Sequence, residues 1–166
     1  MVDASALVSL ASADFLWYPV ANFELVVPQS VVEEIGALGE KPETKAIVDK
    51  IVGVKSKLIV VKPKKSAIGP DRGERDCFLV CLDQGIKLFV LDDFRAIRKM
   101  KPAAISRGIK LLLSVFFIAH AAARRKISED EALTFFDRMA EQRDWLGSRV
   151  YIVGKEFLER ELRKSR

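Results

Sequence analysis

Residues 73–94 predict a helix that runs into a buried strand, and this unit constrains the fold more than any other part of the chain. Phe78 and Leu82 recur at helical spacing, and Gly85 stands just past the end of that pattern, where helix C-termini favour glycine. Residues 87–91 are a short, mostly apolar run typical of a buried parallel strand. Asp92 and Asp93 follow directly, so we expect this strand to end on two carboxylates.

The same alternation continues along the chain. We predict further strands at residues 1–3, 23–27, 58–61 and 109–113, although the last also fits the start of one long helix. The predicted helices follow Ser5, begin at residue 29 and break at Gly39, and span residues 42–54, 94–100, 114–125, 129–142 and 155–163. Pro102 is expected to stop the helix that starts at residue 94, Ser114 to cap the next, and Ser128 to open a capping box. Strands alternating with helices indicate an α/β fold with a parallel sheet covered on both faces.

Acidic residues recur where these predicted strands end or the following helices begin. Because ligands of open α/β sheets bind outside the carboxyl ends of the strands, residues from distant parts of the sequence are expected to meet at one edge. The residues concerned are Asp3, Glu33 or Glu34, Glu74, Asp76, Asp92 and Asp93. Each alone is also explained as a helix cap or as a favourable charge at a helix N-terminus. Together they indicate a cation site.

The charge balance adds a candidate substrate class. The 166 residues include 28 Lys and Arg against 23 Asp and Glu, which gives a net charge of +5. A basic protein around an acidic cluster suggests a polyanionic substrate met through metal ions, while solvated basic faces remain the plain alternative. The basic pieces concerned are residues 55–57, 62–65, 95–99 and 163–166.

The remaining features favour a reduced compartment and no membrane span. Cys77 and Cys81 lie four residues apart on one predicted helix face, and we interpret them as buried small apolar residues in the cytoplasm. The apolar run at residues 111–119 is too short to cross a bilayer. His120, the single histidine, is expected to be a core residue rather than a catalyst.

Four stretches in this order resemble the signature segments of PIN domains. They are residues 1–8 (MVDASALV), 27–35 (VPQSVVEEI), 73–77 (GERDC) and 90–96 (VLDDFRA). The resemblance covers most of residues 1–127 and implies a three-layer α/β/α sandwich on a central parallel sheet. Residues 128–166 are then an added helical extension packed on the same domain. The first strand is short, which leaves open whether it is clipped or the start codon is misassigned.

The resemblance also implies roles for individual residues. Asp3, Glu34, Asp76 and Asp93 match the four acids that hold the metal and support catalysis. Asp92 is the alternative fourth acid, Glu74 an auxiliary metal ligand, and Ser5 a partner for a metal-bound water. The implied cofactor is Mg²⁺ or Mn²⁺, which prefers oxygen ligands.

The implied function is a metal-dependent endoribonuclease that acts on single-stranded RNA. The sequence does not decide between a toxin of a toxin–antitoxin pair, with an antitoxin as partner, and an RNA-processing enzyme. A homodimer also stays open. The competing hypothesis is a catalytically weak PIN-like module that binds RNA or a protein. A phospho-receiver domain fits less well, because such a site pairs acids after its first strand and Asp3 stands alone.

Overall fold

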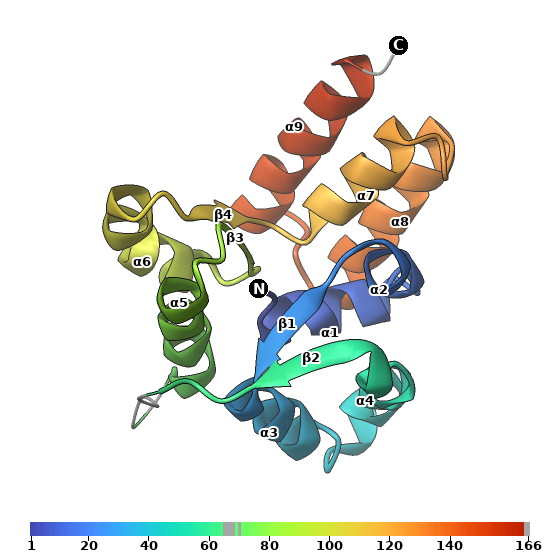
Figure 1. The fold of residues 1–166 in the computed structure, drawn as a ribbon. Coiled ribbons are helices and arrows are strands. Elements are labelled where there is room, and N and C mark those ends of the chain that lie inside the picture. Colours follow the sequence, from blue (N-terminus) through green and yellow to red (C-terminus); the bar gives the residue numbers. More distant parts are fainter. Residues whose placement is uncertain (65–68, 70, 165–166) are drawn as a thin grey trace.

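The computed structural model describes residues 1–64, 69 and 71–164, which form a helix-rich α/β fold (Figure 1). Along the chain the elements are α1 (Ala4–Ser12), α2 (Trp17–Asn22), β1 (Leu25–Pro28), α3 (Gln29–Leu38), α4 (Pro42–Gly53), η1 (Lys55–Lys57), β2 (Leu58–Val61), α5 (Arg72–Gln84), β3 (Leu88–Val90), α6 (Phe94–Ser106), β4 (Lys110–Leu112), α7 (Val115–Ala123), α8 (Glu129–Gln142) and α9 (Arg149–Lys164). Of the predicted basic pieces, Lys65 and Arg166 lie outside the described residues.

The strands pair in parallel, as predicted, but in two separate two-stranded sheets. One pairs β1 with β2, from Leu25 opposite Leu58 onward, and the other pairs β3 with β4, from Leu88 opposite Lys110 onward. The mixed α/β class is therefore confirmed. A single central sheet is not formed by the assigned strands of the described residues.

The first three residues connect the two sheets. The Val2 amide donates to the Val26 carbonyl at 3.0 Å, and the Val90 amide donates to the Met1 carbonyl at 2.9 Å. Val2 also forms an isolated parallel bridge with Val90. The short first strand of the prediction is thus present as an extended segment between β1 and β3, and it carries Asp3 to the edge where both strands end.

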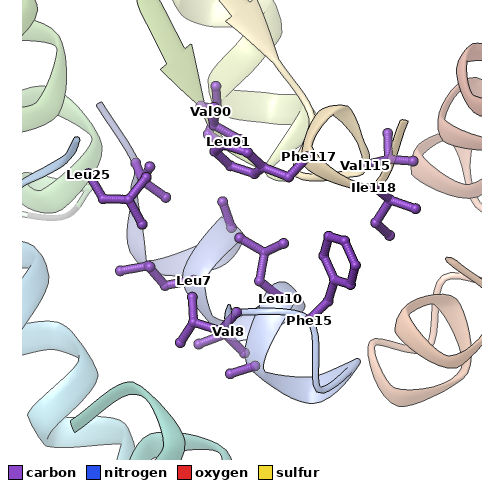
Figure 2. Packing of buried hydrophobic residues seen from close by; sticks show 14 of the residues in the cluster. Leu7, Val8, Leu10, Phe15, Leu25, Val90, Leu91, Val115, Phe117 and Ile118 are labelled. Carbon is purple, nitrogen blue, oxygen red and sulfur yellow. The ribbon is translucent and has the colours of Figure 1, made fainter. Parts of the chain in front are cut away.

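The core surrounds α1, which packs against α3, α4 and α8. Leu7 and Leu10 of this helix are fully buried, together with Phe15, Leu91 and Ile118 from other segments (Figure 2). Burial of each such side chain stabilises the fold by roughly 1.5–3 kcal/mol. A helix buried on nearly all sides gives the residue at its N-terminus, Asp3, a rigid support.

Two predicted boundaries are wrong. Helix α6 continues through Pro102 despite a cost of about 3 kcal/mol for an interior proline, and it packs against β4 with Ala104 buried beyond the proline. Ser114 stands at the N-cap position of α7, as predicted, but its hydroxyl donates to the Met139 sulfur at 3.2 Å and makes no cap hydrogen bond. In addition, α9 begins at Arg149, well before the predicted start, and α2 has no counterpart in the prediction.

Helix α8 follows the prediction more closely than α9 does. Helix α8 spans Glu129–Gln142 as expected, and its capping box joins Ser128 to Glu131. Both α8 and α9 pack against α7, and Arg138 of α8 lies 3.1 Å from Asp14. The predicted boundary between residues 127 and 128 stays a prediction. Within the described part of the chain, no helix is long and apolar enough to span a membrane.

Candidate active site

Asp3 stands at the N-terminus of α1 and is almost fully buried, with 3% of its surface exposed. Its Oδ1 accepts hydrogen bonds from the Ala6 amide at 2.9 Å and from the Ser5 hydroxyl at 2.8 Å. Burial raises the pKa of Asp3 well above its usual range, against these two hydrogen bonds, and the nearby carboxylates of Asp92 and Glu74 add to the rise. Burial and the neighbouring carboxylates therefore disfavour the ionised form of Asp3.

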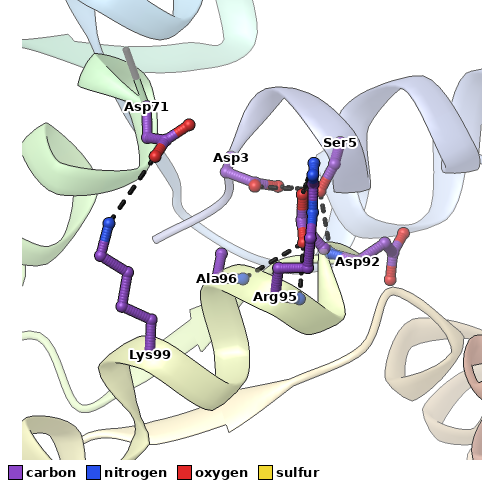
Figure 3. A network of polar contacts seen from close by, with 8 residues as sticks. Asp3, Ser5, Asp71, Asp92, Arg95, Ala96 and Lys99 are labelled. Carbon is purple, nitrogen blue, oxygen red and sulfur yellow. Dashed lines mark hydrogen bonds and ion pairs between the residues drawn. The ribbon is translucent and has the colours of Figure 1, made fainter. Parts of the chain in front are cut away.

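Ser5 links the two strand ends that meet at this edge (Figure 3). Its hydroxyl donates to the Asp3 carboxylate and accepts from the Asp92 amide at 2.8 Å. The family resemblance implies that Ser5 holds a metal-bound water. In the structure this side chain fixes the position of Asp3 relative to the end of β3.

Asp92 and Asp93 point in different directions, because successive side chains of an extended segment alternate. Asp92 is buried, and its Oδ1 accepts from the Ser114 amide at 2.8 Å on the side away from Asp3 (Figure 3). Its Oδ2 makes no hydrogen bond to any described residue, and burial raises its pKa. Asp93 lies at the surface edge and caps α6 through the amides of Arg95 and Ala96, at 2.7 and 3.1 Å.

The pKa of Asp93 is held below its ordinary value. Partial burial works to raise it, but the amides of Ala96 and Arg95 and the Arg95 guanidinium outweigh that effect. Asp93 is therefore ionised at neutral pH while its neighbour Asp92 resists ionisation. This difference favours Asp93 as the acid available to a ligand, and its choice as the fourth acid stays a prediction.

Glu34 reaches the acidic edge from α3. Its Oε2 lies only 2.5 Å from the position that a Cβ on Gly73 would take, so a larger residue than glycine at 73 would displace the carboxylate. Partial burial raises the pKa of Glu34, and the carboxylate of Asp71 adds to this. The glycine of the Gly73-Glu74 pair thus makes room for Glu34 at the start of α5.

Glu74 lies among several other acids. Partial burial raises its pKa to about 7, helped by the negative charges of Asp93, Asp71 and Glu34. This side chain connects Asp3, Glu34 and Asp93 electrostatically, although they come from α1, α3 and the end of β3. We call Asp3, Glu34, Glu74 and Asp93 the acid cluster.

Asp76, the third acid expected from the sequence, lies deeper. It is fully buried, and the Nε of Arg72 approaches its Oδ2 at 3.7 Å. Arg72 also pairs with Glu33 at 3.0 Å, so Glu33 belongs to an exposed ion pair. The structure therefore places Asp76 beside a cation, whereas the charges that act most on Glu74 are anions, with a smaller opposing effect of Lys99.

Asp71 is an acid that the sequence reasoning missed. It precedes α5 with a positive φ of 60°, and its carboxylate pairs with Lys99 of α6 at 3.7 Å (Figure 3). It raises the pKa of both Glu34 and Glu74. The signal that could have found it is its place two residues before the Gly73-Glu74 pair.

The donor chemistry of the acid cluster fits a divalent cation, although its geometry is open. Among the described residues, no three His, Cys, Asp or Glu side chains converge closely enough to hold a metal ion together. Yet the carboxylates raise one another's pKa, and such repulsion is relieved by a bound cation. Hard oxygen donors of this kind are the ligands of Mg²⁺ and Mn²⁺.

The single histidine lies in a different environment. His120 shares a hydrogen bond of 2.8 Å with the Tyr18 hydroxyl and contacts the rings of Phe23 and Phe116. Burial lowers its pKa, and Arg124 adds to that. We call Tyr18, Phe23, Phe116 and His120 the aromatic cluster. The interpretation of His120 as a packed residue agrees with these contacts.

A family model described as PIN domain, DUF3368, matches residues 1–159. The chain belongs to the PIN-domain family. PIN domains are in general nucleases that act on RNA or DNA, so a nuclease-type function follows from the family. No curated protein and no solved structure matches the chain. The match includes α8 and most of α9, which the resemblance seen in the sequence did not cover.

Proposed function

We propose that this PIN domain is a metal-dependent endoribonuclease that hydrolyses single-stranded RNA. The observation that carries the proposal is the meeting of Asp3, Glu34, Glu74 and Asp93 at one edge of the fold, from four separate segments. A fold gains nothing in stability from gathering like charges in a half-buried place, so a functional reason is favoured.

The proposal includes the geometry that brings Asp3 to this edge. We infer that residues 1–3 serve as the middle strand of a parallel layer that joins both sheets, as in a three-layer α/β/α sandwich. Main-chain hydrogen bonds to Val26 and Val90 on its two sides support this. Asp3 is thus anchored despite the shortness of its strand. This weighs against the non-catalytic alternative, whose best support is a displaced Asp3.

In this proposal the acid cluster holds Mg²⁺ or Mn²⁺. A bound cation would supply Lewis-acid stabilisation and would lower the pKa of a bound water molecule. The residues of the chain position it: Ser5 fixes Asp3, the amides of α6 orient Asp93, and Gly73 leaves room for Glu34. Asp76 stays a candidate metal ligand, but its place beside Arg72 favours a supporting role.

The test is cleavage of a single-stranded RNA by purified protein with Mg²⁺ or Mn²⁺, against an EDTA control. The chain has one histidine, so a mechanism with two histidines as base and acid is excluded. Hydrolysis by water is expected to leave a 5′-phosphate and a 3′-hydroxyl. Metal-dependent products that end in a 2′,3′-cyclic phosphate would overturn the mechanism, and an EDTA-resistant activity would overturn metal dependence.

The non-catalytic module remains the second candidate, because no three acids of the described chain converge on a metal position. RNA binding without cleavage under every metal condition would favour it. A toxin and an RNA-processing enzyme share the proposed chemistry. Co-purification with the product of an adjacent small gene, with loss of cleavage in the complex, would favour the toxin and identify its antitoxin.

A further inference from the structure

A groove beside the acid cluster is lined by basic side chains. It runs along α6 to the first residue of α9, and its lining is Phe94, Arg95, Ile97, Arg98, Lys101 and Arg149. No acidic side chain is among these residues. The groove is therefore positively charged at neutral pH, whereas the acid cluster next to it is negative.

The basic residues of α6 divide into two groups. Arg95 and Lys99 lie opposite acids, since Arg95 pairs with Asp93 at 3.4 Å and Lys99 with Asp71 at 3.7 Å. Arg98 and Lys101 are exposed and form no ion pair with any described residue, and the same is true of Arg149 in α9. The groove thus holds three cations whose charge the described chain leaves uncompensated.

The spacing of the cations suits an extended chain of anions. Arg95, Arg98 and Lys101 follow one another at every third residue, so they lie along one side of α6 over roughly 9 Å. Arg95 contacts both the groove and the acid cluster through Asp93. A ligand that follows the row toward Arg95 therefore arrives at the acids.

The groove also has an apolar part. Phe94 and Ile97 line it and are only half-buried, so part of each side chain faces the groove. Aromatic and apolar surface beside cations binds the flat faces of bases, which are free in a single strand and stacked away in a duplex. A single row of cations next to such a surface fits one strand better than two.

We propose that this groove binds the sugar-phosphate backbone of a single-stranded polynucleotide and directs the strand to the acid cluster. Arg98, Lys101 and Arg149 neutralise phosphates, and Phe94 contacts a base. The inference deepens the proposed nuclease function, and the role of the groove in delivering RNA for cleavage rests on that function. Its test measures binding alone, so the two can fail separately.

Binding is measured by fluorescence anisotropy with a labelled 12-nucleotide single-stranded RNA in EDTA, where metal-dependent cleavage cannot proceed. The test variant is R98Q/K101Q/R149Q. The matched control is K41Q/K45Q/K126Q, which removes three exposed lysines that do not line the groove and changes the net charge equally. We expect the groove variant to bind about tenfold or more weakly, while the control stays near the wild-type affinity.

The salt dependence supplies a second readout. Each cation that neutralises a phosphate of a single strand adds about 0.7 to the slope of log K against log salt, so the groove variant should have a slope smaller by about 2. Equally weakened affinity and slope in the two triple variants would overturn the inference. Equal competition by a short polyglutamate peptide would also overturn it, because the groove would then be a general site for acidic partners.

A parallel cleavage assay separates this inference from the proposed function. If wild-type protein binds RNA through the groove but cuts none, the inference stands and the nuclease proposal fails. If wild-type protein cuts RNA and the groove variant has an unchanged KM, the nuclease proposal stands and the inference fails. Both proposals are supported if the groove variant has a raised KM on long RNA and still cleaves a dinucleotide at the wild-type rate.

Discussion

The acid cluster and the aromatic cluster both contain partly buried titratable groups, but the surroundings of these groups differ in charge. In the aromatic cluster, His120 has a hydrogen-bond partner in Tyr18, and its lowered pKa keeps it neutral. In the acid cluster, Glu74 has carboxylates around it and its pKa rises to about 7. A buried group with a partner is explained by packing. Packing does not explain several carboxylates gathered around Glu74, and the comparison therefore distinguishes a structural cluster from a candidate site within one domain.

The largest expected effect is on cleavage. Asp3→Asn and Glu74→Gln should each lower the rate of RNA cleavage by about 100-fold or more, because both remove a charge that holds the cation. Glu43→Gln, which changes an exposed acid at the start of α4, is the matched control and should keep wild-type activity. The rate is measured under single-turnover conditions.

The same assay decides between the two candidates for the third acid. If Glu74 is the ligand, Asp76→Asn should lose less activity than Glu74→Gln, and its loss should accompany a lower melting temperature, since Asp76 is fully buried beside Arg72. Full loss of activity in Asp76→Asn with an unchanged melting temperature would restore the assignment made from the sequence.

The next effect is stabilisation by metal. A ligand that binds only the folded state adds about 2.7 kcal/mol at 100 times its Kd, which corresponds to roughly 5–10 °C in a domain of this size. Mn²⁺ should therefore raise the melting temperature of the wild-type protein and raise that of Asp3→Asn far less. Equal shifts in both proteins would indicate that the metal binds elsewhere.

The aromatic cluster should respond to mutation only through stability. His120→Ala removes the bond to Tyr18 and several ring contacts, so we expect a decrease of about 1–2 kcal/mol in the free energy of unfolding. Tyr18→Phe keeps the ring and should cost less. Urea unfolding gives both values. Cleavage at saturating metal should stay unchanged, and a selective decrease of the rate in a folded His120→Ala protein would contradict the distinction between the clusters.

The smallest effect concerns pH in the absence of metal. Asp3, Glu34, Glu74 and Asp92 have raised pKa values, so the folded state binds their protons more tightly than the unfolded state. Their contribution to stability is greatest near pH 4 and declines as the pH rises toward 7 and above. Glu74→Gln should recover roughly 1 kcal/mol at pH 7.5, a value reduced for solvent screening of this partly exposed group. Urea unfolding in EDTA across this pH range measures the free energy of unfolding of both proteins. A steeper decline with pH in Glu74→Gln than in the wild-type protein would contradict this expectation.

Helices and strands could be predicted from the sequence where residues close in the chain determine them. The capping box of Ser128 and Glu131 located the start of α8, and apolar runs located β2 and β4. It failed at Pro102, where tertiary packing outweighs the intrinsic cost of proline, and at α2, whose Trp17–Asn22 sequence carries no helix cap. The pairing into two sheets could not be predicted either, because the pattern of a strand does not specify its partner.

For the site, the sequence located the acids but not the direction of their side chains. Asp92 and Asp93 are equivalent in sequence, yet one binds the Ser114 amide inside the fold and the other caps α6. Glu74 and Asp76 are only two residues apart, and the choice between them depends on Arg72 and on Glu34, which comes from another helix. Such differences follow from tertiary contacts that a single sequence does not specify.

The most direct test of cation binding at the acid cluster is the titration of metal-free protein with Mn²⁺ at pH 7, by calorimetry in two buffers of different ionisation enthalpy. Because the pKa of Glu74 is about 7, cation binding at the acid cluster should release about half a proton from this residue. Glu74→Gln should bind more weakly and release less. Binding by wild-type protein without proton release, or with the same release in Glu74→Gln, would contradict a metal site at the acid cluster.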